Sequence, residues 1–151
     1  MLAPGLRSQQ TARASAALPA AGAWDAAPVE LFSTGAESVT LHMTYTRGGA
    51  GGAVDFQMQV SPYSLLTLAP ASAAEWQHMT QYTAGVLAAG VDTQSREQRE
   101  YITYQAVGAT TEAFVYGPVD LAERIERIRV TARESGNAGA PGTFAVTAMF
   151  R

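Results

Sequence analysis

Residues 38–61 read SVTLHMTYTRGGAGGAVDFQMQVS, and this stretch decides the fold class. Two runs of alternating apolar and polar residues, 39–46 and 54–61, flank a glycine-rich break at 47–52. Successive side chains of a strand point to opposite faces, so each run has one apolar and one polar face. The pattern predicts two strands joined as a β-hairpin with a flexible tip, and hence a half-buried antiparallel sheet. The apolar positions are Val39, Leu41, Met43, Tyr45, Val54, Phe56, Met58 and Val60.

Similar short segments recur along the chain and are separated by turn signals. Strands are predicted at 29–32, 101–107, 112–116, 127–133 and 143–151, and a strand or short helix at 75–82, with Trp76 in the core. Residues 61–73, which contain Pro62 and Pro70, are expected to form a loop or an edge segment. An exposed turn is expected at 94–100 and a helical turn at 119–124. In 127–133 the apolar residues Ile128, Val130 and Ala132 should face inward and the arginines outward. This pattern predicts an all-β fold, an antiparallel β-sandwich of the jelly-roll or immunoglobulin-like type.

The first 27 residues differ from the rest of the chain. They are rich in Ala, Ser, Pro and Gln, and their central stretch is too weakly hydrophobic for a signal peptide. We therefore predict an extended, non-cleaved N-terminal arm at 1–27, followed by the sandwich domain at 28–151. Trp24 is expected to anchor the arm, and deletion of residues 1–23 to leave the domain folded. Such an arm orders when a partner holds it, which makes Arg7, Arg13 and Trp24 candidate partner contacts.

Composition narrows the choice of partners. A chain of 151 residues is one domain by its length, and it contains no cysteine and no lysine. Its net charge of −3 argues against non-specific attraction to nucleic acid or to an anionic membrane. No segment approaches the roughly 18 consecutive apolar residues of a membrane span. We therefore expect neither nucleic acid nor a membrane as a partner.

No pattern of catalytic residues stands out. His42 and His78 are far apart in the sequence, and Asp92, Glu97 and Glu100 lack the spacing of a calcium loop. There is no GxSxG elbow, and the glycines at 48–52 open no helix that could hold a phosphate. The sequence therefore predicts a protein that is not an enzyme and that has no metal and no cofactor.

Two further segments are candidate binding surfaces. Arg127, Arg129 and Arg133 share the outward face of one predicted strand, with acidic neighbours that partly neutralise them. We expect this stripe to pair with a neighbouring subunit or to stay solvated rather than to bind nucleic acid. The apolar loop at 61–73, with Tyr63, Leu65 and Leu66, either contacts a subunit or covers the domain's own core. Exposed aromatic residues keep a carbohydrate- or receptor-binding module open as an alternative function.

The order of these features resembles small structural proteins of tailed-phage virions. The resemblance covers residues 24–151: an early strand and turn, the segment SVTLHMTYTRGGAGGAVDFQMQVSP, a tryptophan-bearing segment at Glu75-Trp76, and a late strand at 124–134 that leads through a glycine turn into 141–146. The chain departs from the family pattern by being rich in Ala and Arg rather than Lys and Asn. Proteins of this kind are β-sandwiches that decorate or cement the outside of a capsid, often as trimers.

The resemblance implies a function and a set of partners. It suggests a capsid decoration (cement) protein, assembled in the host cytoplasm and located on the capsid surface of the virion. Its partners would be the major capsid protein and further copies of itself, as a homotrimer. A tail or neck position in the virion is a further alternative.

Overall fold

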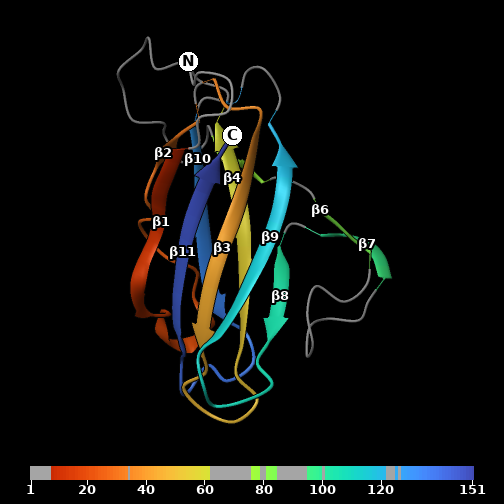
Figure 1. The fold of residues 1–151 in the computed structure, drawn as a ribbon. Helices are drawn as coiled ribbons and strands as arrows, with labels where there is room; N and C mark the ends of the chain where they lie inside the picture. The colour runs from red at the N-terminus through yellow and green to blue at the C-terminus, as the bar shows by residue number, and fades with distance from the viewer. Residues whose placement is uncertain are drawn as a thin grey trace.

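The structure is a computed structural model that describes residues 8–33, 35–61, 76–78, 81–84, 95–99, 101–121, 125 and 127–151. Within these residues the chain forms two antiparallel sheets packed face to face (Figure 1). The predicted fold class, an all-β antiparallel sandwich, is confirmed. No helix in the described residues is long and apolar enough to cross a membrane.

The first sheet, sheet A, has the strand order β1 (Ser8–Ala17), β11 (Thr143–Phe150), β3 (Ser38–Thr46) and β9 (Glu112–Asp120). Every second residue of its two central strands points into the core, as the alternation predicts. The side chains at these positions are at most 2% exposed: Val39, Leu41, Met43, Tyr45, Phe144, Val146, Ala148 and Phe150. Their alternation with polar residues is the physical reason that both segments fold as strands with one buried face.

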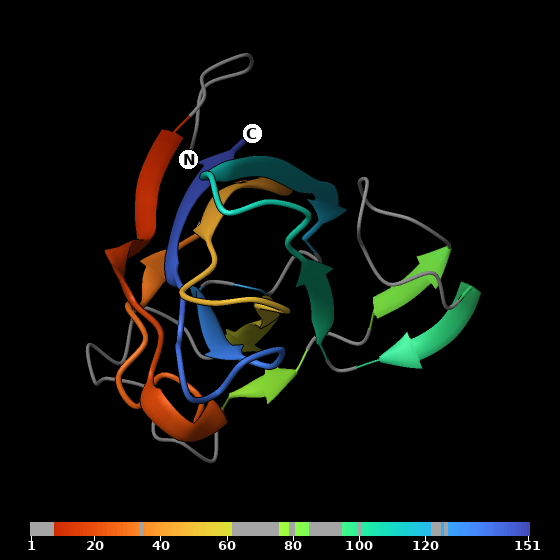
Figure 2. The same cartoon turned by 90° about the horizontal axis from the view of Figure 1, so that it is seen from below.

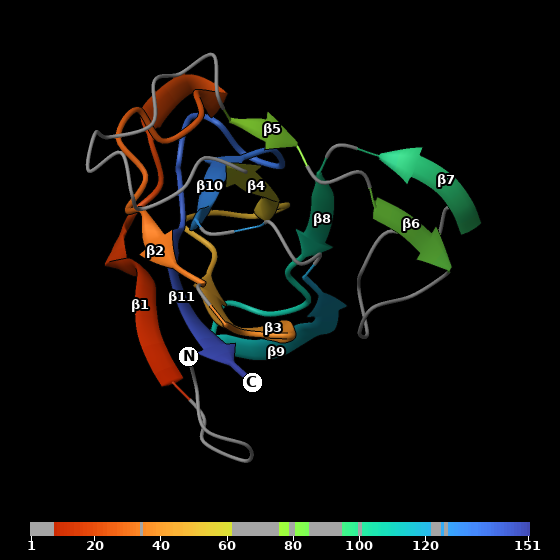
Figure 3. The same cartoon turned by 90° about the horizontal axis from the view of Figure 1, so that it is seen from above.

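The second sheet, sheet B, is built on β4 (Ala53–Ser61) and β10 (Arg127–Glu134). β2 (Leu31–Phe32) extends it beside β10, while β5 (Gln77–His78) and β8 (Ile102–Gln105) pair with different parts of the other edge of β4. Seen along the strands, sheets A and B form two opposed layers (Figures 2 and 3). The core between them contains a stacked pair of rings, Tyr104 and Phe114, with centroids 3.9 Å apart.

The two strands of the segment 38–61 do not form a hairpin, and that prediction is wrong. β3 pairs with β11 and β9 in sheet A, whereas β4 pairs with β10, β5 and β8 in sheet B. The glycine-rich residues 47–52 therefore cross between the sheets, which in a sandwich lie about 10 Å apart. Six residues reach about 20 Å when extended, so this connection is long enough. Alternation gives each strand an apolar face but does not say whether two successive strands lie side by side or face to face.

A second crossing, residues 135–142, leads from β10 to β11 at the same end of the sandwich. The two crossings pack against each other: the Asn137 amide donates to the Ala50 carbonyl at 3.1 Å, and the Ser135 N–H donates to the Ala53 carbonyl at 2.8 Å. A Cβ at Gly136 would collide with the backbone of residues 51–53. The glycines of this end are therefore packing positions, and the predicted flexible tip is held in place.

Glu134, the last residue of β10, accepts hydrogen bonds from the second crossing and from Ala53, which directly follows the first. Its side chain points into the sandwich and is 1% exposed, and its carboxylate accepts five hydrogen bonds. Tyr45 Oη donates to it at 2.7 Å, and the other donors are backbone N–H groups, at Ala53, Gly136, Asn137 and Gly142. Burial raises the pKa of Tyr45, and so does its hydrogen bond to Glu134, so the phenol stays protonated and available as a donor.

The predicted division at residue 27 does not appear in the described part of the N-terminal segment. Residues 8–17 are β1, an edge strand of sheet A that pairs with β11, and Ala12 and Leu18 are buried in the core. The 3-10 turn η1 (Ala20–Gly22) and the following residues then lead to the edge of β10. Deletion of residues 1–23 would remove β1, so it cannot leave the domain intact. Alternating Ala, Ser and Gln were sufficient for an edge strand because one face of it stays in water.

Three smaller predictions also differ from the structure. The expected turn at 94–100 contains β7 (Ser95–Arg99), which pairs with β6 (Gln81–Ala84) as a ribbon beside β8 (Figures 1 and 3). The expected helical turn at 119–124 begins as strand, since β9 continues to Asp120. Trp76 is 8% exposed but lies outside the core cluster between the sheets.

Candidate functional site

The outer face of β10 carries the arginines that the sequence singled out. Arg127, Arg129 and Arg133 alternate with the buried apolar residues of the strand, as predicted. This face is covered rather than solvated: Arg127 is 3% exposed and Thr131 is 4% exposed. The polar face of the neighbouring β4 is buried as well, at Asp55, Gln57 and Gln59. Sheet B therefore has a second, polar layer on its outside.

Arg133 is fixed by contacts on two sides. Its Nε donates to Asp55 Oδ2 at 2.9 Å, and Asp55 is anchored in turn by the Thr103 hydroxyl at 2.7 Å. The guanidinium carbon lies 4.6 Å from the ring centroid of Trp24 and 5.1 Å from that of Tyr101. Such cation–π contacts restrain a guanidinium beside the aromatic rings. The two terminal amino groups donate to no described residue, so they are left for another partner.

Arg129 has a similar arrangement, four residues before Arg133 on the same face of β10. Its Nε donates to Gln59 Oε1, whose own amide nitrogen donates to Gln57 Oε1 at 2.9 Å. Its guanidinium carbon lies 4.3 Å from the ring centroid of Trp76. Burial lowers the pKa of Arg129 from its ordinary value, and the Glu30 carboxylate opposes this shift. Arginine nevertheless keeps its charge at neutral pH, so a partly desolvated cation remains here.

A cavity of about 580 Å³ lies between these two arginines. Its volume falls within the range of about 300–1,000 Å³ that is typical of small-ligand pockets. The lining combines aromatic rings, planar amides, a hydroxyl, a carboxylate and two guanidinium groups: Trp24, Asp25, Ala26, Pro28, Gln57, Gln59, Tyr101, Arg129, Thr131 and Arg133. We refer to it as the sheet B pocket.

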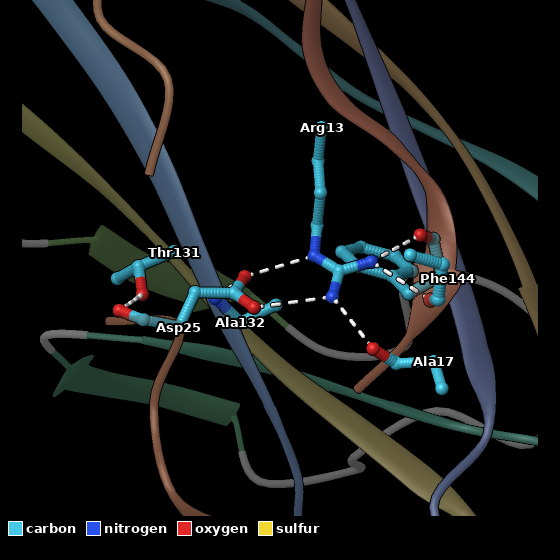
Figure 4. Close-up of polar contacts among 7 residues, drawn as sticks. Arg13, Ala17, Asp25, Thr131, Ala132 and Phe144 are labelled. Carbon is cyan, nitrogen blue, oxygen red and sulfur yellow. Dashed lines mark hydrogen bonds and ion pairs between the residues drawn. The ribbon is translucent and has the colours of Figure 1, made fainter. Parts of the chain in front are cut away.

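Asp25 joins the sheet B pocket to the edge of the sandwich. Its carboxylate is held by Arg13, with Nε to Oδ2 at 2.8 Å and Nη2 to Oδ1 at 3.1 Å, and it also accepts from the Ala132 N–H at 3.2 Å (Figure 4). The remaining Arg13 donors bind the carbonyl oxygens of Ala16, Ala17 and Phe144. All five N–H donors of Arg13 are therefore used within the domain. A register shift in β1 on either side of Arg13 turns the side chain across the gap between the sheets.

The structure brings together three of the candidate residues taken from the sequence. Trp24, Arg129 and Arg133 line one cavity although more than a hundred residues separate the first from the others. Arg127 lies apart, with Nη1 3.7 Å from Glu30 Oε2. Arg13 was expected to contact a partner, but it is an internal clamp. Arg7, Tyr63, Leu65 and Leu66 lie outside the described residues.

Several residues of the sheet B pocket were not predicted as site residues from the sequence. Gln57 and Gln59 were assigned to the polar face of a strand, and that polarity was the available signal, since their alternation places them beside the arginine stripe once β4 pairs with β10. Asp25 carried no signal, because it is a single carboxylate in a segment that was interpreted as an arm. Tyr101 was assigned to a strand and noted as a possible exposed aromatic, and it sits directly before β8.

The outer face of sheet A is chemically different. The residues that point outward from its central part include no Asp, Glu or Arg, and His42 is exposed among them, whereas the exposed Asp120, which pairs with Ser38, lies at one end of this face. A shallow hollow of about 270 Å³ lies around His42, Ala113, Val115 and Thr147. We call this surface the threonine face; it comprises Thr40, His42, Thr44, Thr46, Ala113, Val115, Thr143, Ala145, Thr147 and Met149.

Within the part of the chain that the structure describes, no group of three or more His, Cys, Asp or Glu side chains could hold a metal ion. The carboxylates considered for a calcium loop, at Asp92, Glu97 and Glu100, belong to residues whose side chains are not described.

In comparisons with protein families, curated proteins and solved structures, nothing matches this chain.

Proposed function

We propose that this protein is a non-enzymatic structural protein of a virion, and specifically a capsid decoration protein that binds the outside of a phage head. The observation that carries the proposal is the threonine face, whose ten residues include no Asp, Glu or Arg on a chain whose charged fraction is 15%, with the exposed Asp120 lying outside it at one end of the sheet. Charged residues are depleted at the centre of protein interfaces, because they must lose their water there. The order of strands along the sequence, which resembles that of small virion proteins, supports the same function.

The size of the threonine face suggests how such a protein would attach. The three strands of this face, about 4.8 Å apart and about 27 Å long, cover roughly 400 Å². A stable interface buries about 800 Å² on each partner, so a single copy would bind weakly through this face alone. Attachment would then depend on several linked contacts, to the major capsid protein and to further copies of the chain in a homotrimer. The location that follows is the capsid surface.

A substitution at the centre of the face tests this proposal. Thr44 is exposed on β3, so Thr44→Arg should fold normally but place a charge in the contact. We expect the variant to lose co-sedimentation with heads of the phage whose genome encodes the chain. Thr110→Arg, which lies in an exposed loop outside the face, is the matched control. Equal attachment of Thr44→Arg and the native protein would refute the role of this face. If purified native virions of that phage do not contain the chain, the proposed function is refuted.

A carbohydrate- or receptor-binding module is the second candidate function. The observation that favours it is the sheet B pocket, where aromatic rings and hydrogen-bonding side chains line one cavity. Rings contact the apolar faces of sugars while amides and guanidinium groups bind their hydroxyls. A glycan array together with a heat-shift screen tests it, since a decoration protein without a ligand should respond to no sugar.

A further inference from the structure

The sheet B pocket presents three kinds of chemistry to one cavity. Guanidinium groups attract an anion and can bind a carboxylate in a planar two-point geometry. Amides, a hydroxyl and a carboxylate exchange hydrogen bonds with hydroxyl groups. Aromatic rings pack against apolar ring faces. The ligand that satisfies all three is a hydroxylated ring that also carries a carboxylate.

The guanidinium groups are prepared for such a ligand. Arg129 and Arg133 each have their Nε bound to sheet B, and their guanidinium carbons lie 4.3 Å from the Trp76 ring centroid and 4.6 Å from the Trp24 ring centroid, so the two terminal amino groups of each are restrained in position. Fixing a side chain before binding lowers the entropy that the ligand must overcome. The terminal amino groups of both arginines form no hydrogen bond to a described residue, although the Glu30 carboxylate interacts electrostatically with Arg129.

The carboxylates near the pocket do not repel an anion as strongly as their number suggests. Asp25 is paired with Arg13 at 2.8 Å, and Asp55 is bound by Arg133 at 2.9 Å. Asp25 has oxygen lone pairs left to accept from a hydroxyl group. An acidic peptide would bring carboxylates but no hydroxylated ring, so it would leave the aromatic and hydroxyl-binding parts of the lining unused.

We propose that the sheet B pocket binds an acidic saccharide, whose carboxylates are held by the terminal amino groups of Arg129 and Arg133. This inference deepens the second candidate function and is independent of the threonine face, which lies on the opposite sheet. It names the ligand class, a sugar bearing uronic or other carboxylate groups, and the residues that distinguish it from a neutral sugar.

The two tryptophans of the chain report on binding directly. Trp24 packs on Arg133 and Trp76 packs on Arg129, so the intrinsic fluorescence of the native protein monitors both ends of the site. Four probes are titrated at low salt: trigalacturonate, its methyl ester, the neutral trisaccharide maltotriose, and a capped triglutamate peptide. We expect a saturable change with trigalacturonate, and binding at least about tenfold weaker for the ester, which has lost the charge.

Variants locate the interaction. Arg133→Gln should weaken trigalacturonate binding at least about tenfold, as expected when a charged hydrogen bond is lost. Arg151→Gln, an exposed arginine outside the pocket, should leave it unchanged. Because Arg133→Gln removes the ion-pair partner of Asp55 and can destabilise the domain, the comparison of acid and ester on the native protein stands as an independent test.

The titrations distinguish the acidic ligand class from saccharide binding in general, which is the second candidate function. Equal binding of the acid, the ester and maltotriose would overturn the acidic class while supporting a saccharide-binding module. Tighter binding of the triglutamate peptide would overturn the saccharide class in favour of an acidic peptide. No response to any saccharide would overturn both the inference and the second candidate function.

Discussion

The carboxylate of Glu134 gives the sharpest test of how this sandwich is held together. It lies where both crossings between the sheets meet, and it accepts hydrogen bonds from Tyr45 and from four backbone N–H groups. The change Glu134→Ala removes every one of these acceptors. We expect it to lower the free energy of unfolding more than any other single truncation of a charged residue in the described chain.

The size of the effect follows from the donors that lose their acceptor. Three of them are buried: the Tyr45 hydroxyl at 2.7 Å, and the N–H groups of Ala53 and Gly142, each at 2.9 Å. A buried donor without a partner costs about 1–3 kcal/mol. The sum is reduced because water can enter the space and because a buried carboxylate is itself costly to desolvate. We expect a loss of about 4 kcal/mol, which is a large part of a typical stability of about 5–15 kcal/mol.

Urea unfolding followed by circular dichroism and tryptophan fluorescence measures this loss. Glu134→Gln keeps the volume and one carbonyl oxygen but turns an N–H₂ group toward other donors, so we expect about 2 kcal/mol. Tyr45→Phe removes one donor of five and should cost about 1 kcal/mol. The matched control is Glu37→Ala, an exposed residue, which should change stability by less than about 0.5 kcal/mol. A loss below about 1 kcal/mol for Glu134→Ala, with an unchanged denaturant dependence, would refute the reasoning.

Three further perturbations follow from the same contacts. Arg13→Lys keeps the charge but loses the two-point contact with Asp25 and the carbonyl contacts, and should cost about 2 kcal/mol in urea unfolding; an effect within error of zero would mean that the clamp does not hold the sheets. Gly142→Ala places a Cβ 2.5 Å from the Thr46 carbonyl oxygen and should lower the melting temperature, whereas Gly51→Ser, where nothing lies within 4 Å but φ is +75°, should cost only about 1 kcal/mol. Burial raises the pKa of Tyr116 to about 12, so the folded state keeps a proton that the unfolded state loses above about pH 10. Stability should therefore be constant up to about pH 9 and fall between about pH 10 and 12, and an unfolding free energy that stays level across that interval would contradict the assignment.

The alternation of apolar and polar residues was sufficient to predict β3, β4, β10 and β11 and their apolar faces, but not β1 or β7. Ile128, Val130 and Ala132 point inward, as do Phe144, Val146, Ala148 and Phe150, because a period of two is a local property of the chain. Glu134 was expected only as one of the acidic neighbours that partly neutralise the arginine stripe. Its position has the parity of the core, and only the five donors of the two crossings make a buried carboxylate stable there.

Part of the candidate site was predicted from the sequence. The arginine stripe and Trp24 were identified as contacts, and two of the three arginines join Trp24 in one cavity. Residues 24–27 were interpreted as part of an arm, so their place along the edge of β10 was not predicted. The hydrogen bond from the Asp25 N–H to the Ala132 carbonyl at 3.0 Å fixes that place, and it joins residues that are 107 positions apart.

The sequence by itself determined that this chain forms strands, which face of each strand is apolar, and that its outer surfaces carry arginines on one strand and threonines on another. These properties depend on neighbours two residues away along the chain. Only the tertiary structure decided that β3 and β4 face each other across the core rather than pair, and that Trp24, Arg129 and Arg133 surround one pocket. Pairing and convergence depend on the packing of segments far apart in the sequence, and a repeat of two residues carries no information about which distant segment is the partner.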